Sequence, residues 1–192
     1  MNRKYIILDI ETCPISLENY FEKDEEEKLK LLNPIDSRIV AIGLRFENVN
    51  YIFQSEDEKE ILSKFWEKWK EIKLGSALIP VVGFNITSFD MPFIVTRSFI
   101  QNIRIESFSL KEIIDLRDKI NAYKYGKTRG KLKEFAEIIG QEILEVNGSD
   151  VSRLCYEKDY LTLNKYLEKD LEITDALYKR AVETNVINVN RY

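Results

Sequence analysis

The chain has 192 residues, 44% hydrophobic and 32% charged, and its 33 acids and 29 bases give a net charge of -4. This composition predicts one α/β domain, residues 1–192, with a proper hydrophobic core. The absence of histidine excludes Ser-His-Asp and Cys-His nucleophile chemistry and the usual catalytic zinc sites. The acidic balance argues against a protein that coats nucleic acid, because such proteins neutralise phosphates with basic surfaces.

No apolar stretch is long enough to cross a bilayer, and the N-terminus lacks the residue order of a signal peptide. We therefore expect a cytoplasmic protein with no membrane partner. Cys13 and Cys155 are isolated in the sequence and lack metal-type spacing. They are expected to be reduced thiols rather than a disulfide.

The first predicted element is a strand at residues 4–12, where an apolar, β-branched run reaches Asp9, Glu11 and Thr12. Side chains two positions apart share one face of a strand, so the carboxylates of Asp9 and Glu11 lie side by side. Burying both is costly without a positive partner, and Mg²⁺ or Mn²⁺ suits an oxygen-only site. The alternative is a strand that ends in solvent with two ordinary acids.

A charged insertion follows at about residues 14–37. Its apolar residues recur at roughly helical spacing among many acids and lysines, and Asn33-Pro34 ends the pattern. This predicts one or two short exposed helices. They form either a flap beside the acid pair or an ordinary solvated face, and the run of charges favours the solvated face.

Residues 38–46 and 50–54 predict two strands joined by a tight polar turn, which gives the sheet an antiparallel start. Residues 55–74 predict a helix whose apolar stripe includes Trp66 and Trp69. Tryptophans can stack on nucleic-acid bases. Their helical spacing favours a packing role in the core.

A buried strand at residues 78–84 leads through a polar turn into a helix whose first turn contains Pro92. Asp90 lies at this junction, at the edge of the sheet where ligands of open α/β sheets bind. An acidic helix cap is its alternative role. Capping does not explain Asn85, five residues earlier.

Residues 112–116 predict the last strand, and residues 131–139 a short helix. The loop between them contains basic residues that either hold substrate phosphates or are ordinary surface groups: Lys124, Lys127, Arg129 and Lys131. The longest helical pattern covers residues 159–182, and Tyr166 and Asp170 lie one turn apart on it. Without further context, these two are a packed tyrosine and a solvated acid.

Three motifs in this order carry a family resemblance. Asp-Ile-Glu-Thr at 9–12, Asn-x-x-x-Phe-Asp at 85–90 and Tyr-x-x-x-Asp at 166–170 resemble the motifs of DEDD (DnaQ-like) 3′-to-5′ exonucleases. The third motif is that of the tyrosine branch, and residues 82–94 are especially similar to the proofreading domain of family B DNA polymerases. Tyr-x-x-x-Asp also begins at Tyr5 and Tyr20, so order and context select the late pair.

The resemblance implies an RNase H-like α/β fold, with a central mixed five-stranded sheet, helices on both faces and the acids at one end. It implies an exonuclease that releases nucleoside 5′-monophosphates from single-stranded DNA with two Mg²⁺ or Mn²⁺ ions. The implied metal ligands are Asp9, Glu11, Asp90 and Asp170. Tyr166 completes the implied catalytic set by orienting the attacking water. The implied contacts to the terminal nucleotides come from Thr12, Asn85 and Phe89.

Other functions stay open on the sequence alone. Trimming of RNA 3′ ends is the nearest alternative. A non-catalytic module for protein assembly, and a nuclease or integrase of the same fold that cuts internally, are two others. Because the chain lacks a basic surface, we expect weak, distributive binding or a polymerase, helicase or repair partner that delivers the strand end. The family does not use the position of Asp115 as a ligand, so we expect that residue to be structural.

Overall fold

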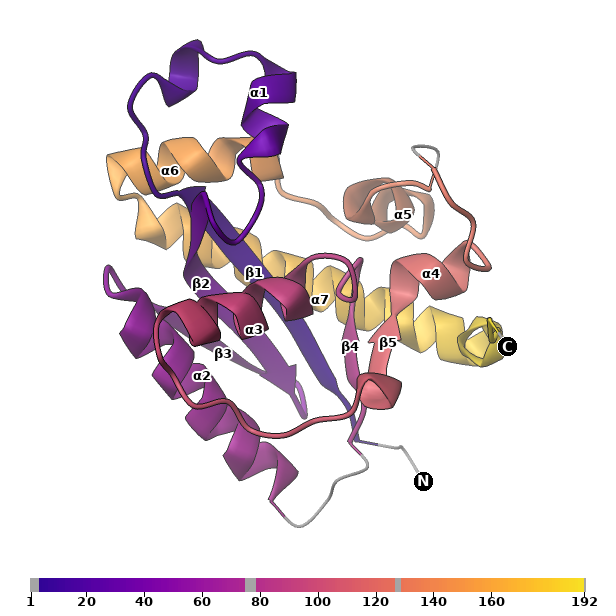
Figure 1. The fold of residues 1–192 in the computed structure, drawn as a ribbon. Coiled ribbons are helices and arrows are strands. Elements are labelled where there is room, and N and C mark those ends of the chain that lie inside the picture. The colour runs from indigo at the N-terminus through magenta and orange to yellow at the C-terminus, as the bar shows by residue number, and fades with distance from the viewer. Residues whose placement is uncertain (1–3, 75–78, 127–128, 192) are drawn as a thin grey trace.

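The computed structural model describes residues 4–74, 79–126 and 129–191, and a mixed five-stranded sheet forms its centre (Figure 1). The strands lie in the order β3-β2-β1-β4-β5. Three consecutive strands are antiparallel neighbours: β1 (Ile6–Pro14), β2 (Ser37–Phe46) and β3 (Val49–Gln54). Two short strands continue the sheet in parallel: β4 (Val81–Gly83) and β5 (Ile113–Asp115). The predicted mixed sheet and its antiparallel start are confirmed.

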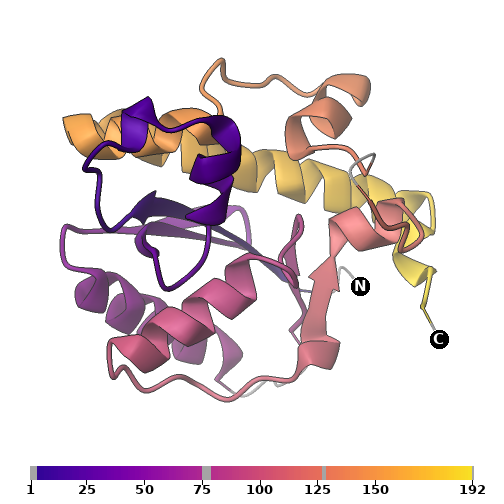
Figure 2. The same ribbon diagram turned by 45° about the horizontal axis from the view of Figure 1, so that its top comes forward.

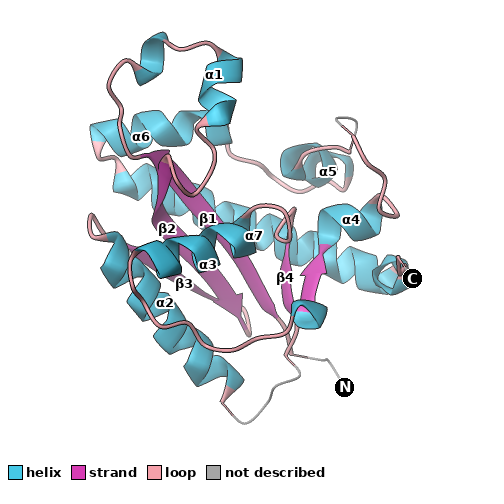
Figure 3. Cartoon of the chain, viewed as in Figure 1, coloured by secondary structure: helices cyan, strands magenta, loops and turns pink. Residues whose placement is uncertain are grey.

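Helices cover both faces of this sheet, as Figures 1 and 3 show. One face packs against α2 (Glu58–Lys73) and α3 (Asp90–Ile100). The other packs against α7 (Tyr160–Glu183), the longest described helix. Shorter helices surround these layers: α1 (Glu25–Lys30), α4 (Leu116–Ile120), α5 (Leu132–Ile138) and α6 (Val151–Glu157). Single 3₁₀ turns lie at η1 (Tyr20–Glu22), η2 (Leu110–Glu112), η3 (Gly148–Asp150) and η4 (Val186–Asn188).

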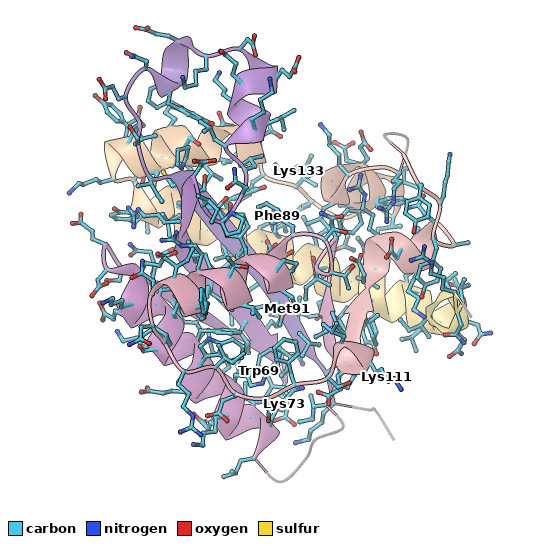
Figure 4. All side chains as sticks on the ribbon, viewed as in Figure 1. Trp69, Lys73, Phe89, Met91, Lys111 and Lys133 are labelled. Atoms are coloured by element: carbon cyan, nitrogen blue, oxygen red, sulfur yellow. The ribbon has the colours of Figure 1, made fainter. Side chains whose placement is uncertain are left out.

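The α2 helix shows why its tryptophans belong to the core. Asp57 caps it by accepting a hydrogen bond from the Lys59 amide at 2.9 Å. Trp66 and Trp69 are buried against the sheet, and the Trp66 indole donates to the Ser98 hydroxyl at 3.0 Å. Figure 4 shows Trp69 in this layer of side chains. The predicted packing role of both tryptophans is confirmed.

Gly43 on β2 lets α7 approach the sheet closely. It pairs with Asp9 across the β1–β2 ladder. A Cβ atom at this position would lie 2.9 Å from side-chain atoms of Leu167 and Leu171, which α7 buries against the sheet. The missing side chain therefore sets how near α7 lies to β1.

The first and second strands are joined by a segment, residues 15–36, that contains η1 and α1. Its ends meet, because the Ile15 amide donates to the Asp36 carbonyl at 2.9 Å and extends the β1–β2 ladder. A reciprocal capping box between Asp24 and Glu27 starts α1. The prediction of one or two short helices here is confirmed.

The parallel strands are shorter than the apolar run at residues 78–84 predicts. Only residues 81–83 pair as β4, because Pro80 has no amide hydrogen for the ladder, although its carbonyl accepts from Ile6 at 2.9 Å. Leu78 lies outside the described residues. None of the described helices has the length and apolar character needed to span a bilayer.

Cys13 and Cys155 are distant in sequence but adjacent in space. Both are buried free thiols in one hydrophobic cluster, and their mutual hydrogen bond raises the pKa of Cys13 above its ordinary value. They tie the end of β1 to α6. Both are free thiols, as expected from their sequence spacing, which gives no sign of their contact in space.

Candidate active site

Three carboxylates from two elements converge at one end of the sheet. Asp9 and Glu11 come from β1 and Asp170 from α7, and one oxygen of each lies within 4.8 Å of the others. Strand alternation explains the pair on β1, because Ile7 of the same face packs with α7 while Ile6 and Leu8 pack with the opposite layer. The predicted side-by-side placement of the two acids is therefore observed.

Asp90 reaches the same cluster from the opposite layer. It is the first residue of α3 and is buried, and its Oδ1 accepts a hydrogen bond from the Ile10 amide at 3.1 Å. Burial raises the pKa of Asp9, and the charge of Asp90 raises it further. Phe89 occupies the N-cap position without a side-chain hydrogen bond. The alternative role of Asp90 as the helix cap is therefore wrong.

The carboxylates raise one another's pKa. Removal from water raises the pKa of Asp9 and Glu11 well above its usual range, and repulsion from neighbouring carboxylates, including Asp170, raises both further. Desolvation also raises the pKa of Asp90 to about 7 and that of Asp170 to about 6, although hydrogen bonds oppose both shifts. The four carboxylates therefore need additional positive charge nearby if all of them are to be ionised at neutral pH.

The residues present fit a divalent metal ion. Oδ1 of Asp170 is buried and accepts no hydrogen bond within the described residues. Such an unpaired acceptor costs about 1–3 kcal/mol. The donor set consists of carboxylate oxygens, the ligands that Mg²⁺ and Mn²⁺ prefer. A divalent ion would coordinate the unpaired oxygen and would also neutralise the excess negative charge.

Tyr166 lies on α7 one turn before Asp170. It is buried, and desolvation together with the charges of Glu11 and Asp170 raises the pKa of its hydroxyl above the ordinary value. The phenol therefore stays protonated at neutral pH. It can donate a hydrogen bond to an oxygen atom in the site, but it cannot act as a general base there.

Lys133 on α5 is a site residue that sequence reasoning missed. Its ammonium lies 5.1 Å from the centre of the Tyr166 ring and donates to the carbonyl of Leu144 at 2.8 Å. Its charge lowers the pKa of both Glu11 and Asp170 against the larger effect of burial. Figure 4 places Lys133 and Phe89 at the same end of the sheet.

For the basic residues of the loop before α5, phosphate binding and an ordinary surface role are both open on the sequence alone. Arg129 forms an ion pair with Asp118. The Lys131 side chain is exposed at the start of α5, and the Lys124 side chain is exposed along the same loop. Lys127 lies outside the described residues. No signal in the sequence distinguishes Lys133 from these neighbours.

Two of the three predicted substrate contacts lie beside the acids. Thr12 and Phe89 line one pocket together with Glu11. The β1–β2 register shifts between Glu11 and Thr12, where a β-bulge bends the end of β1 locally. Asn85 lies apart from this pocket, in a left-handed conformation with φ 66°.

The turn that carries Asn85 is held by Asp115. One carboxylate oxygen accepts from the Asn85 amide at 3.0 Å, and the other accepts from the Thr87 amide and hydroxyl at 3.1 and 2.7 Å. Arg117 donates to the Asn85 side chain at 3.4 Å. Asp115 thus organises the second motif, in keeping with the structural role expected for it.

The pocket beside Glu11 has a volume of about 440 Å³. One wall is the 15–36 segment, which contributes Tyr20, Phe21, Lys28 and Leu29 among others. The acids at the start of α1 are exposed, as the charge run predicts. The other side of the segment nevertheless lines the pocket beside Glu11, so the structure favours a flap next to the acids over a purely solvated face.

The comparisons with known proteins agree with this geometry. A family model described as "Predicted 3'-5' exonuclease related to the exonuclease domain of PolB" matches residues 37–188. An uncharacterised protein of Methanocaldococcus jannaschii, MJ0365, is 30% identical over 167 residues, which cover 81% of this chain and 92% of that protein. The family B DNA polymerase of the hyperthermophilic archaeon Pyrobaculum calidifontis matches 97% of this chain with a TM-score of 0.73 and 17% identity.

The chain spans 25% of the length of that polymerase, and at this identity the likeness shows the fold alone. It confirms the predicted RNase H-like class. The matched residues 37–188 include Asp90, Tyr166 and Asp170, while β1 with Asp9 and Glu11 precedes them. The chain therefore belongs to the family of predicted 3′-5′ exonucleases related to the exonuclease domain of PolB.

Proposed function

We propose that this chain is a metal-dependent 3′-to-5′ exonuclease that acts on single-stranded DNA ends and releases nucleoside 5′-monophosphates. The observation that carries the proposal is the convergence of Asp9, Glu11 and Asp170 within 4.8 Å, with one buried oxygen of Asp170 unpartnered among the residues that the structure describes. Family membership and the nearby Asp90 and Tyr166 support it. We further propose that it works in the cytoplasm, on ends supplied by a polymerase or a repair partner.

Asp9, Glu11 and Asp170 would hold one Mg²⁺ or Mn²⁺ ion, and Asp9 with Asp90 a second. Divalent ions in such a site neutralise charge on the phosphate and make water more acidic. The protonated Tyr166 hydroxyl donates a hydrogen bond that orients the attacking water. Attack on phosphorus breaks its bond to the 3′-oxygen of the preceding nucleotide, which frees the terminal 5′-monophosphate.

The substrate contacts belong to this proposal as well. Thr12 and Phe89 line the pocket beside Glu11, where a terminal nucleotide would lie next to the acids. Aromatic faces stack on any base, so Phe89 provides binding without sequence preference. Asn85 would contact the strand from the turn held by Asp115.

The test is a gel assay with 5′-labelled single-stranded DNA and RNA of one sequence, in Mg²⁺, Mn²⁺ or chelator. We expect a metal-dependent ladder that shrinks from the 3′ end, with DNA degraded faster than RNA. Asp170→Ala should slow cleavage by about 10³-fold or more, because several kcal/mol of charge stabilisation are lost. Glu172→Ala, an exposed acid on the same helix, is the matched control and should leave the rate unchanged.

Two of the alternatives have their own signature in this assay. Intact substrate in every lane, from protein shown to be folded, would overturn the proposal in favour of the assembly module. A faster ladder on RNA would identify an exoribonuclease.

A further inference from the structure

The pocket beside Glu11 has two walls that the motif residues do not supply. Its floor contains Glu11, Thr12 and Phe89. One wall is the 15–36 segment. The other wall is residues 148–153, which form η3 and the start of α6. Figures 1 and 2 show the 15–36 segment beside α6 at this end of the sheet.

Specific contacts hold the two walls together. Tyr20 is 8% exposed, and its hydroxyl oxygen accepts a hydrogen bond from the Ser152 hydroxyl at 3.0 Å. The rings of Phe21 and Tyr156 meet edge to face, with their centroids 5.4 Å apart. The 15–36 segment is therefore docked on α6. A strand passing between them would have to break these contacts.

The lining of the pocket suits a base and a sugar better than a phosphate chain. Tyr20, Phe21 and Leu29 present aromatic and apolar surface, on which bases stack with little sequence preference. The two cations at the rim are each paired with a neighbouring acid, Lys28 with Glu25 at 3.2 Å and Arg153 with Asp150 at 3.6 Å. Among the described residues that line the pocket, no uncompensated positive charge is therefore offered to a second phosphate.

The size of the pocket gives the same answer. A volume of about 440 Å³ lies toward the small end of ligand pockets, which span about 300–1,000 Å³. This volume is enough for one nucleoside. Because Glu11 belongs both to the pocket and to the acid cluster, the bound nucleoside would place its own 5′-phosphate at the acids.

We propose that the 15–36 segment and α6 form the binding site for the 3′-terminal nucleoside, and that this wall restricts cleavage to strand ends. The inference rests on the proposed exonuclease function and adds a specificity determinant to it. The determinant is the charged insertion between the first two strands, the part of the chain that departs from the resemblance to proofreading domains.

The first test places a charge in the pocket without disturbing the core. Leu29 is 64% exposed on α1, so Leu29→Glu should leave the fold and calorimetric Mn²⁺ binding unchanged. We expect it to weaken binding of thymidine 5′-monophosphate, measured with Mn²⁺ present, by about tenfold or more. It should raise KM for single-stranded DNA more than it lowers kcat. Leu110→Glu, at a 74% exposed site elsewhere, is the matched control.

The second test removes the wall. Since Ile15 and Asp36 are already hydrogen-bonded, residues 16–35 can be replaced by an Asn-Gly turn without stretching β1 or β2. Wild-type protein should leave circular single-stranded DNA intact. The shortened protein should nick the circle and lose its preference for ends.

The outcomes separate the inference from the function on which it rests. Wild-type protein that binds Mn²⁺ but degrades no linear strand would overturn the proposed function. An active wild type whose Leu29→Glu variant binds thymidine 5′-monophosphate as tightly would overturn the inference alone. A folded, shortened protein that still leaves circular single-stranded DNA intact would also overturn the inference alone. If the shortened protein does not fold, the Leu29→Glu result decides.

Discussion

Glu58 and Asp170 are both buried carboxylates, and the chain surrounds them in opposite ways. Glu58 on α2 accepts from Arg97 at 2.5 and 2.9 Å. Gln101 and the Ile39 amide each add a hydrogen bond of 2.7 Å. Arg97 in turn donates to the carbonyl of Pro34 at 3.0 Å. Both oxygens of the carboxylate are satisfied.

The acid cluster lacks this completeness. Asp170 has an oxygen without a partner within the described residues, and the charge of Lys133 offsets only part of the effect of burial. A buried charge whose partners are all present has the cost of its burial offset, and removing one partner alone restores that cost. One whose partners are missing raises the free energy of the empty site and favours a ligand that completes it. Removing one charged group should therefore lower the free energy of unfolding at Glu58 and raise it at the acid cluster of the metal-free protein.

The largest expected effect is at the completed pair. Arg97→Met should lower the free energy of unfolding by about 3–5 kcal/mol, because it leaves Glu58 buried without its cation. Urea denaturation measures this loss. Calorimetric Mn²⁺ affinity of the remaining folded protein should be unchanged.

Two further variants sharpen this prediction. Replacing both Glu58 and Arg97 by Met should recover most of the lost stability, since no unpaired charge remains. Arg104→Met, at an exposed position, should have little effect. A double variant as unstable as the single one would contradict the assignment of the loss to an uncompensated charge.

At the acid cluster, a substitution should increase the stability of the protein instead of lowering it. Asp170→Asn should stabilise the metal-free protein by about 1 kcal/mol, because it removes one of the mutually repelling carboxylates. Thermal melts with chelator and with Mn²⁺ test both parts of this expectation. In wild type Mn²⁺ should raise Tm, and in Asp170→Asn that gain should largely disappear. If Asp170→Asn instead lowered Tm in chelator, the proposed difference between the two regions would be contradicted.

The same cluster should make stability depend on pH. The pKa of Asp170 is raised to about 6 and that of Asp90 to about 7, from the ordinary value of 3.8. Between about pH 4 and about pH 7 the folded state therefore binds more protons than the unfolded state, so this contribution to stability falls as pH rises. Urea titrations across this range should show a shallower fall in Asp170→Asn than in wild type. Parallel curves for the two proteins would contradict it.

The smallest expected effect concerns Lys133. Lys133→Met removes a charge that lowers the pKa of Glu11 and Asp170. The pH of half-maximal Mn²⁺ binding should therefore rise, by about half a unit. Lys131→Met, two residues earlier and exposed, is the matched control. An equal shift in both variants would show that only net charge matters.

Much of the arrangement of the acid cluster follows from local geometry, which the residue spacing in a sequence can predict. Alternation along a strand places Asp9 beside Glu11, and a four-residue spacing places Tyr166 one turn from Asp170. The order of the motifs then brings β1 and α7 together through the family fold. The sheet follows from the apolar runs in the same way.

The remaining features depend on tertiary contacts that have no local signal. Lys133 reaches Tyr166 only because the chain after α5 folds back to offer the Leu144 carbonyl. Cys13 meets Cys155 across more than half of the chain. The 15–36 segment has the charge pattern of a solvated face, and its docking through Tyr20 and Ser152 joins residues 132 positions apart.

Gly43 contributes no functional group, yet it governs the spacing on which the cluster depends. A relative could keep every acid of the three motifs and gain one methyl group at this position. Its last helix would then be pushed outward, and the ligand of that helix would move away from the two on β1. An inventory of motif residues is therefore an insufficient guide to which members of the family are active, and the residue opposite Asp9 belongs in any such survey.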